Sequence, residues 1–213
     1  MPTISEESNE EIMRIAESLD TISKAIKKQA DKLRDDPTRL EPALNILHKA
    51  TLTPKGKIII TGVGKSYLIS QKLAATMTSI GTRAISLHAT EAVHGDLGII
   101  DKGDCLLALS YSGETQEVIR VCEIIREWGD CWVVGMGKSI ESPLGAMCDA
   151  WIECLVDEEL SSNVCAPTTS SSLMLAMGDA IAVLLMQKRR FGPLDFARNH
   201  PGGFLGKQFQ KSL

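Results

Sequence analysis

Short apolar runs that alternate with longer helical segments constrain the fold of this 213-residue chain more than any other feature. The following residues form such runs, and each is compatible with a strand: 57–61, 83–87, 105–110, 131–136 and 150–155. Because the runs are apolar on both faces, they predict parallel strands that are covered by helices on two sides. We therefore expect an α/β fold, a three-layer αβα sandwich around a five-stranded parallel sheet in the flavodoxin-like order 2-1-3-4-5.

Helical segments are indicated by apolar spacing and by end signals. Residues 6–34 repeat apolar side chains at intervals of three and four, which is typical of an amphipathic helix, and Pro37 ends it. The pattern predicts further helices over these segments: 40–50, 65–80, 112–128 closed by Gly129, a Ser-Pro start at 142–143, and 168–190. We expect residues 1–50 to be N-terminal helices that pack on the domain and contribute an oligomer interface, and residues 51–213 to form a single ligand-binding domain.

Composition and charge narrow the class of protein. The net charge is −4 and the basic residues are scattered, which argues against a nucleic-acid or membrane-surface partner. The six cysteines form no C-x-x-C pair and lie mostly in apolar runs, as reduced structural cysteines do. The opening segment is acidic rather than signal-like, and Asp179 interrupts the most apolar stretch. We expect a cytoplasmic protein without a membrane span.

The stretch Gly62-Val63-Gly64-Lys65-Ser66 follows the first predicted strand and suggests a phosphate-binding turn. It is not a nucleotide P-loop, because the first glycine of that motif would stand where Ile59 is. It is not a dinucleotide fingerprint either, because the third glycine position is Tyr67. A short strand–turn–helix can still place an anion at its helix N-terminus, while a plain turn with a solvated lysine remains the alternative.

A second polar turn, residues 110–115, follows the third predicted strand. In the order 2-1-3-4-5, the first and third strands are neighbours, and the connections that leave them run to opposite sides of the sheet. The turns at 62–66 and 110–115 are therefore expected to face one crevice. The hydroxyls of Ser110, Ser112 and Thr115 would form a compact phosphate cradle there. The alternative is a capping box with Ser112 as the helix N-cap.

Three other loops carry titratable side chains. His88, Glu91 and His94 suit metal ligation, acid–base work or a structural loop, and their spacing matches no standard zinc pattern. Residues 157–159 are three consecutive carboxylates. They indicate either a solvated acidic turn or a loop that supplies a general base. His200 precedes Pro-Gly-Gly, which indicates either a simple turn or a mobile flap.

Taken together, these loops resemble the sugar isomerase (SIS) family, and within it the D-arabinose 5-phosphate isomerase branch. The likeness covers about residues 45–210 and rests on five motifs in register: G-V-G-K-S at 62–66, H-A-T-E-A-V-H-G-D-L-G at 88–98, S-Y-S-G-E-T at 110–115, A-P-T-T-S at 166–170 and H-P-G-G-F-L-G at 200–206. Many members carry a further pair of CBS domains, and we expect this chain to be a short form without them.

The resemblance implies an aldose–ketose isomerase that works without metal or cofactor. Such an enzyme interconverts D-ribulose 5-phosphate and D-arabinose 5-phosphate through a cis-enediol, at the entry to Kdo biosynthesis. A nucleotide-activated Kdo (CMP-Kdo) would then be a possible feedback ligand. The family assembles as homotetramers with shared active sites, and we expect the same assembly here.

The resemblance also assigns roles to residues. Lys65 would stabilise the enediolate, Glu159 would be the proton-transfer base, and His200 would open the ring or protonate an oxygen. Glu114 and His88 complete the expected catalytic set, and the division of work between the two glutamates is open. The expected phosphate-binding residues are Ser110, Ser112, Thr115, Ser66 and Thr168.

Two alternatives stay open at the level of sequence. One is a non-catalytic sugar-phosphate sensor that uses the same fold, and the other is an isomerase of a different sugar phosphate, such as a hexulose or heptose phosphate. Residue 89 is alanine where the family has proline, and residues 161–165 depart from the family's usual segment beside the sugar.

Overall fold

A computed structural model describes residues 6–53 and 55–202, and the statements below refer to those ranges. Its centre is a five-stranded parallel sheet in the order β2-β1-β3-β4-β5, which confirms the predicted order. The strands have these bounds: β1 Ile58–Gly62, β2 Ala84–His88, β3 Cys105–Leu109, β4 Trp132–Gly137 and β5 Ala150–Glu153.

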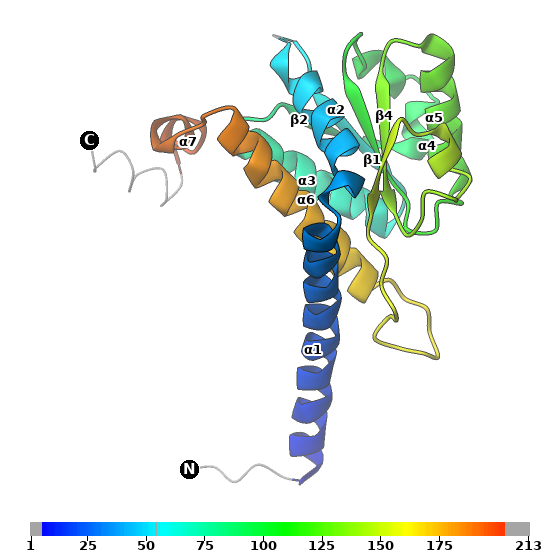
Figure 1. Ribbon diagram of the computed structural model, residues 1–213, viewed down its shortest axis with the longest axis vertical. Coiled ribbons are helices and arrows are strands. Elements are labelled where there is room, and N and C mark those ends of the chain that lie inside the picture. Colours follow the sequence, from blue (N-terminus) through cyan, green and yellow to red (C-terminus); the bar gives the residue numbers. More distant parts are fainter. Residues whose placement is uncertain (1–5, 54, 203–213) are drawn as a thin grey trace.

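Helices cover both faces of the sheet, as Figure 1 shows. The α-helices are α1 Glu6–Asp35, α2 Glu41–Leu52, α3 Lys65–Ser79, α4 Ala89–Ala92, α5 Gln116–Trp128, α6 Thr169–Lys188 and α7 Pro193–Asn199. Single turns of 3₁₀-helix are η1 Pro37–Arg39, η2 Asp96–Ile99 and η3 Gly145–Met147. The first half of α1 extends away from the rest of the chain (Figure 1).

The central strands are buried on both faces because successive side chains point into opposite layers. In β1, Ile58 and Ile60 belong to the apolar cluster with α2, α3 and α6, whereas Ile59 belongs to the cluster with α4 and α5. This alternation between two apolar cores confirms the three-layer sandwich that the doubly apolar runs predict.

The predicted helix at Ser142-Pro143 is wrong. Residues 138–149 form turns and the single turn η3. The backbone N–H of Leu144 donates to the carbonyl of Gly113 at 2.9 Å, which ties this segment to the turn after β3. A Cβ on Gly145 would lie 1.8 Å from the carbonyl oxygen of Ile140, so this close approach of the backbone requires glycine.

Helix α6 is the long apolar segment predicted at 168–190. By length and composition alone it is the one described helix that could cross a membrane, but half of it is buried inside the fold. It packs closely on α3, since a Cβ on Gly178 would lie 2.4 Å from Leu73 Cδ1. We interpret α6 as a core helix, and its contact with α3 brings the N-termini of the two helices to the same end of the sheet.

Candidate active site

A crevice of about 180 Å³ opens at the carboxyl ends of β1 and β3, where the strand order reverses. Three segments line it: the turn after β1 with the first residues of α3, the second residue of the turn after β3, and the start of α6. The lining residues are Val63, Lys65, Ser66, Ile69, Tyr111, Pro167, Ser170, Ser171 and Met174. The two turns that the sequence predicts at one crevice therefore both contribute to it.

The turn after β1 delivers Lys65 and Ser66 to this crevice. Gly64 is the N-cap of α3 at φ 59° and ψ −127°, a conformation that favours glycine. A Cβ on Gly62 would lie 2.9 Å from Ser66 Cβ, so the turn also needs a glycine at its start. Lys65 is exposed in the first turn of α3, where the free N–H groups of the helix favour a negative charge.

Tyr111 is a lining residue that the sequence analysis did not single out. Its hydroxyl oxygen accepts a hydrogen bond from the Val156 N–H at 3.3 Å, which links the turn after β3 to the segment after β5. Burial raises the pKa of Tyr111 above its ordinary value, so it presents a neutral phenol. Its position inside the S-Y-S-G-E-T motif was the available signal.

The hydroxyls of the predicted phosphate cradle form hydrogen bonds mainly to other groups of the same turn, residues 110–115. Ser110 is buried, and its Oγ lies 2.9 Å from Thr115 Oγ1 and accepts from the Gly113 N–H at 3.1 Å. Ser112 is exposed, and its Oγ accepts from the Glu114 N–H at 3.2 Å. Thr115, rather than Ser112, stands at the N-cap of α5, so the capping alternative with Ser112 as N-cap is wrong.

The carboxylate of Glu159 lies at the N-terminus of α6. Its Oε2 accepts from the Thr168 N–H at 2.8 Å, from Thr168 Oγ1 at 3.0 Å and from the Ser170 N–H at 3.3 Å. Its Oε1 accepts from the Ser170 hydroxyl. Since Ser170 lines the crevice, Glu159 is held one hydrogen bond from it.

These hydrogen bonds set the charge state of Glu159. Burial alone would raise its pKa, but hydrogen bonds from Ser170 and from Thr168 stabilise the ionised form more strongly and lower the pKa below its usual value. The positive end of the α6 dipole acts in the same direction. Glu159 is therefore a carboxylate at neutral pH.

The remaining carboxylates of the two loops, Asp157, Glu158 and Glu114, are exposed, whereas Glu159 is half-buried. The exposed Asp157 pairs with Lys28 of α1 at 2.6 Å, so it bridges to a different helix. Glu114 is exposed on the turn after β3. Asp157 and Glu159 therefore have different partners, Lys28 and the start of α6.

His88 lies beside the turn that carries Lys65. It ends β2 opposite Gly62 of β1, and its ring meets the Tyr67 ring edge-on with centroids 4.6 Å apart. Its Nδ1 accepts from the Thr90 N–H at 3.3 Å, which makes it the N-cap of α4. In the described ranges, no three His, Cys, Asp or Glu side chains gather in a metal-binding group.

His200 lies at the opposite end of α3 from Lys65. Its ring stacks on Phe196 with centroids 3.9 Å apart, and Asn199 Nδ2 donates to the Ser79 carbonyl at 3.3 Å. Because α3 has 15 residues, Lys65 and this contact are roughly 20 Å apart along the helix. One chain therefore does not bring His200 into its own crevice. Residues 203–206 of the same motif lie outside the described residues.

Comparison with known proteins agrees with this architecture. The family model of the SIS domain matches residues 51–184. The chain is 36% identical over 197 residues to arabinose 5-phosphate isomerase KpsF of Escherichia coli, covering 92% of this chain and 58% of the relative. It is 40% identical over 157 residues to arabinose 5-phosphate isomerase KdsD of Pseudomonas aeruginosa, covering 74% of this chain and 48% of the relative. The chain thus spans about half the length of these relatives.

A solved structure of an Escherichia coli protein in complex with arabinose 5-phosphate has a similar fold. It superposes with a TM-score of 0.77 at 33% sequence identity, covering 88% of this chain and 97% of that chain.

We predict that Ser170→Ala raises the pKa of Glu159 towards its ordinary value, because it removes the hydroxyl donor to Oε1. A carboxyl group whose pKa is lower in the folded than in the unfolded protein stabilises the fold at pH values above its unfolded pKa. That stability is lost as the pH falls through the folded pKa. The variant should therefore lose part of this pH-dependent stability. Carboxyl ¹³C chemical shifts followed over pH measure the pKa directly.

Ser171→Ala is the matched control. The Ser171 hydroxyl donates to the carbonyls of Pro167 and Thr168 and not to Glu159, so the pKa should stay unchanged. An equal shift in both variants, or no shift in Ser170→Ala, would contradict the assigned hydrogen bond.

Proposed function

Because the chain belongs to the SIS domain family, we propose that it is a sugar-phosphate isomerase that interconverts D-ribulose 5-phosphate and D-arabinose 5-phosphate. The crevice is the observation that carries this proposal. Lys65 and the N-termini of α3 and α6 favour a phosphate or an enediolate in this crevice. The carboxylate of Glu159 is one hydrogen bond away, through Ser170. The names of the relatives and the neighbour bound to arabinose 5-phosphate support the choice of sugar.

In this proposal Glu159 moves the proton between C1 and C2. A carboxylate has about four lone-pair positions, and Oε2 already accepts three hydrogen bonds whereas Oε1 accepts one. Oε1 is therefore the atom that takes the proton from C2 of the aldose, and the electron pair of that C–H bond forms the cis-enediolate. Transfer of the hydroxyl proton from O2 to O1 and return of the carbon-bound proton to C1 then give the ketose, and no metal or cofactor takes part in the step.

Lys65 would stabilise the negative charge that develops on the enediolate oxygens, because it is the cation that lines the crevice. Ser66, at the start of α3, is well placed for the phosphate. Thr168 and Ser110 are already bonded to Glu159 and Thr115, so we propose that they orient those groups. Ser112, Thr115 and Glu114 would then face the substrate from the turn after β3.

We propose that the active site is completed by a second copy of the chain in a homotetramer. His200 lies at the far end of α3 from its own crevice, so it would act on the substrate of a neighbour, with His88 beside the shared site. Helix α1 offers a surface for assembly, because it exposes these apolar side chains: Ile12, Met13, Ile15, Leu19 and Ile26. We propose in addition the division of the chain into N-terminal helices at 1–50 and a ligand-binding domain at 51–213.

A sensor of sugar phosphates is the second candidate function. The hydrogen bonds that Glu159 accepts favour a sensor, because they suit a carboxylate that only caps the N-terminus of α6. An isomerase of another sugar phosphate also remains, because residues 161–165 differ from the family pattern. If the pentose assignment holds, we place the protein in the cytoplasm at the entry to Kdo formation, with CMP-Kdo as a feedback ligand.

We predict that Glu159→Gln abolishes the isomerase, because the amide cannot accept the carbon-bound proton, which comes from C1 of ribulose 5-phosphate or from C2 of arabinose 5-phosphate. Ribulose 5-phosphate in D₂O, followed by proton NMR, should give arabinose 5-phosphate with the wild type and about 100-fold less, or none, with the variant. Asp157→Asn is the control, since Asp157 pairs with Lys28 and should be dispensable. Sugar-phosphate binding without product or deuterium exchange in the wild type would favour the sensor instead.

The shared site predicts recovery of activity on mixing two inactive variants. Co-assembled Lys65→Ala and His200→Ala chains should regain about a quarter of the wild-type activity, because random mixing leaves one site in four with both groups intact. Lys65→Ala with Glu159→Gln is the control, since both groups come from one chain and no site is restored. An equal result in the two mixtures, or full activity of His200→Ala alone, would contradict a shared site.

A further inference from the structure

Tyr111 lines the crevice together with Lys65, but the proposed proton transfer does not use it. Its side chain is half-buried and packs against the apolar core that α2, α3 and α6 share with the sheet. Its hydroxyl accepts from the Val156 N–H at 3.3 Å, so the side chain also contacts the segment after β5. The residue therefore brings a phenol to the candidate active site and is held there from two sides.

The backbone that carries Tyr111 is fixed against the end of β4. The Lys138 N–H donates to the Tyr111 carbonyl at 2.8 Å, and the Ser110 N–H donates to the Met136 carbonyl at 3.2 Å. A Cβ on Gly137 would lie 2.1 Å from the Ser110 carbonyl oxygen, so this close approach of the two segments requires glycine. The phenol ring therefore starts from a defined position at the carboxyl edge of the sheet.

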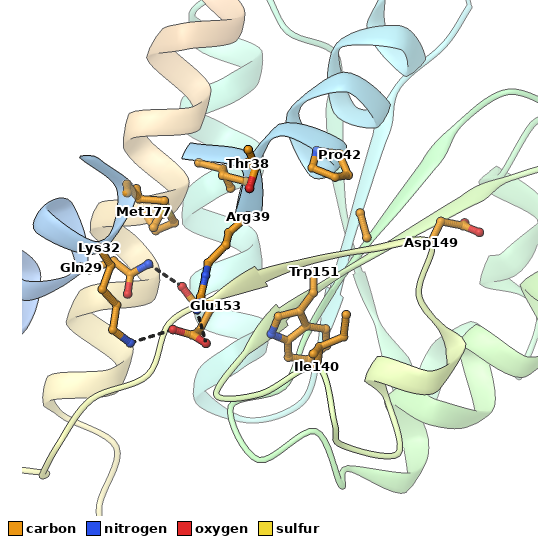
Figure 2. Close-up of a pocket in the computed structure, with 13 residues that line it drawn as sticks. Gln29, Lys32, Thr38, Arg39, Pro42, Ile140, Asp149, Trp151, Glu153 and Met177 are labelled. Carbon is orange, nitrogen blue, oxygen red and sulfur yellow. Dashed lines mark hydrogen bonds and ion pairs between the residues drawn. The ribbon is translucent and has the colours of Figure 1, made fainter. Parts of the chain in front are cut away.

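The segment that the phenol contacts is anchored at both ends. Figure 2 shows its start, where Lys32 of α1 bonds to the side chain of Glu153 at 2.7 Å. Its other end is Glu159, whose carboxylate accepts hydrogen bonds from the start of α6. Val156 lies between these two anchors, so the Tyr111 hydroxyl meets an N–H group in a fixed place.

The hydrogen of the Tyr111 hydroxyl has no acceptor among the residues that the structure describes, because its one hydrogen bond there is accepted. Two other hydroxyls of the crevice already donate: Ser170 to Glu159, and Ser171 to backbone carbonyls at the start of α6. Ser66 is the hydroxyl that we propose for the phosphate. Tyr111 is thus the lining residue with a hydroxyl donor available for the sugar itself.

The environment keeps this donor protonated. Burial raises the pKa of Tyr111, and the negative charge of Glu159 acts in the same direction. The phenol is therefore neutral at neutral pH, whereas Lys65 brings a positive charge to the same crevice. A neutral donor that is already in place stabilises charge that develops in a transition state, because it need not reorganise when the charge appears.

We propose that Tyr111 is a further catalytic residue, whose hydroxyl donates a hydrogen bond to the carbonyl oxygen of the sugar phosphate. This role rests on the proposed function. When Glu159 takes the carbon-bound proton, the electron pair of that C–H bond forms the new carbon–carbon double bond, and the π pair of the carbonyl moves onto oxygen. The hydrogen bond from Tyr111 stabilises the negative charge on that oxygen, and the phenol keeps its own proton.

The first test compares the wild type with Tyr111→Phe, which keeps the aromatic ring and removes the hydroxyl. Conversion of ribulose 5-phosphate to arabinose 5-phosphate is followed by proton NMR. We expect kcat to fall about 100-fold while KM changes little, because the donor acts on charge that develops in the transition state. A kcat close to that of the wild type, or a loss confined to KM, overturns the proposal. Circular dichroism verifies that the variant is folded.

A second test separates donation to the substrate from acceptance of the Val156 N–H, because Tyr111→Phe removes both. The residue at position 111 alone is replaced by 3,5-difluorotyrosine, whose phenol has a lower pKa and can still accept from Val156. Ionisation removes the donated hydrogen but leaves the oxygen as an acceptor. We expect kcat to fall with rising pH, and to do so at a lower pH in the labelled protein than in the wild type.

The other ionisable groups around the phenol are the same in both proteins, so a displaced pH profile belongs to residue 111. They are Cys154, Asp157 and Glu159 of the segment after β5, and Lys65 of α3. Identical pH profiles would contradict the donor role and leave the phenol as a structural acceptor.

Failure of this role is distinguishable from failure of the proposed function. A wild type that forms no arabinose 5-phosphate from ribulose 5-phosphate overturns both. An active wild type with an equally active Tyr111→Phe variant overturns the role of Tyr111 and leaves the isomerase in place.

Discussion

The contact between the Glu159 carboxylate and the N-terminus of α6 holds the candidate active site together. It satisfies backbone N–H groups of Thr168 and Ser170 that the helix itself leaves without partners. It also ties the segment after β5 to a helix that packs on α3. The same bonds keep the carboxylate ionised, which couples the architecture of the site to its chemistry.

A second constraint is the close packing of α3 on α6 at Gly178 and Leu73. It places the N-termini of both helices at the carboxyl edge of the sheet, next to the reversal between β1 and β3. Each helix contributes partial positive charge there, and Lys65 adds a full one. A buried apolar contact in the core thus places this positive charge at the crevice.

The parallel sheet was predictable because apolar runs alternate with helical segments along the chain, and that pattern is local; β1 and β3 at its centre are buried on both faces. The crevice was predictable because Gly62–Ser66 and Ser110–Thr115 must meet where the order reverses. The turn at 138–149 was not, because its bond to Gly113 joins segments far apart in the sequence. For the same reason sequence alone did not reveal Tyr111 as a wall of the crevice. His200 was assigned from resemblance, and the geometry of one chain leaves it outside the crevice.

Binding of a sugar phosphate through Lys65, in the crevice at the start of α3 and α6, is the step on which the proposed function depends. Calorimetric titration with arabinose 5-phosphate tests it most directly, with wild type, Lys65→Met and the control Lys72→Met. Lys72 lies on the same helix but pairs with Asp179 and does not line the crevice. We predict that Lys65→Met loses binding at least tenfold while Lys72→Met binds as the wild type does. Unchanged binding by Lys65→Met would contradict the assignment.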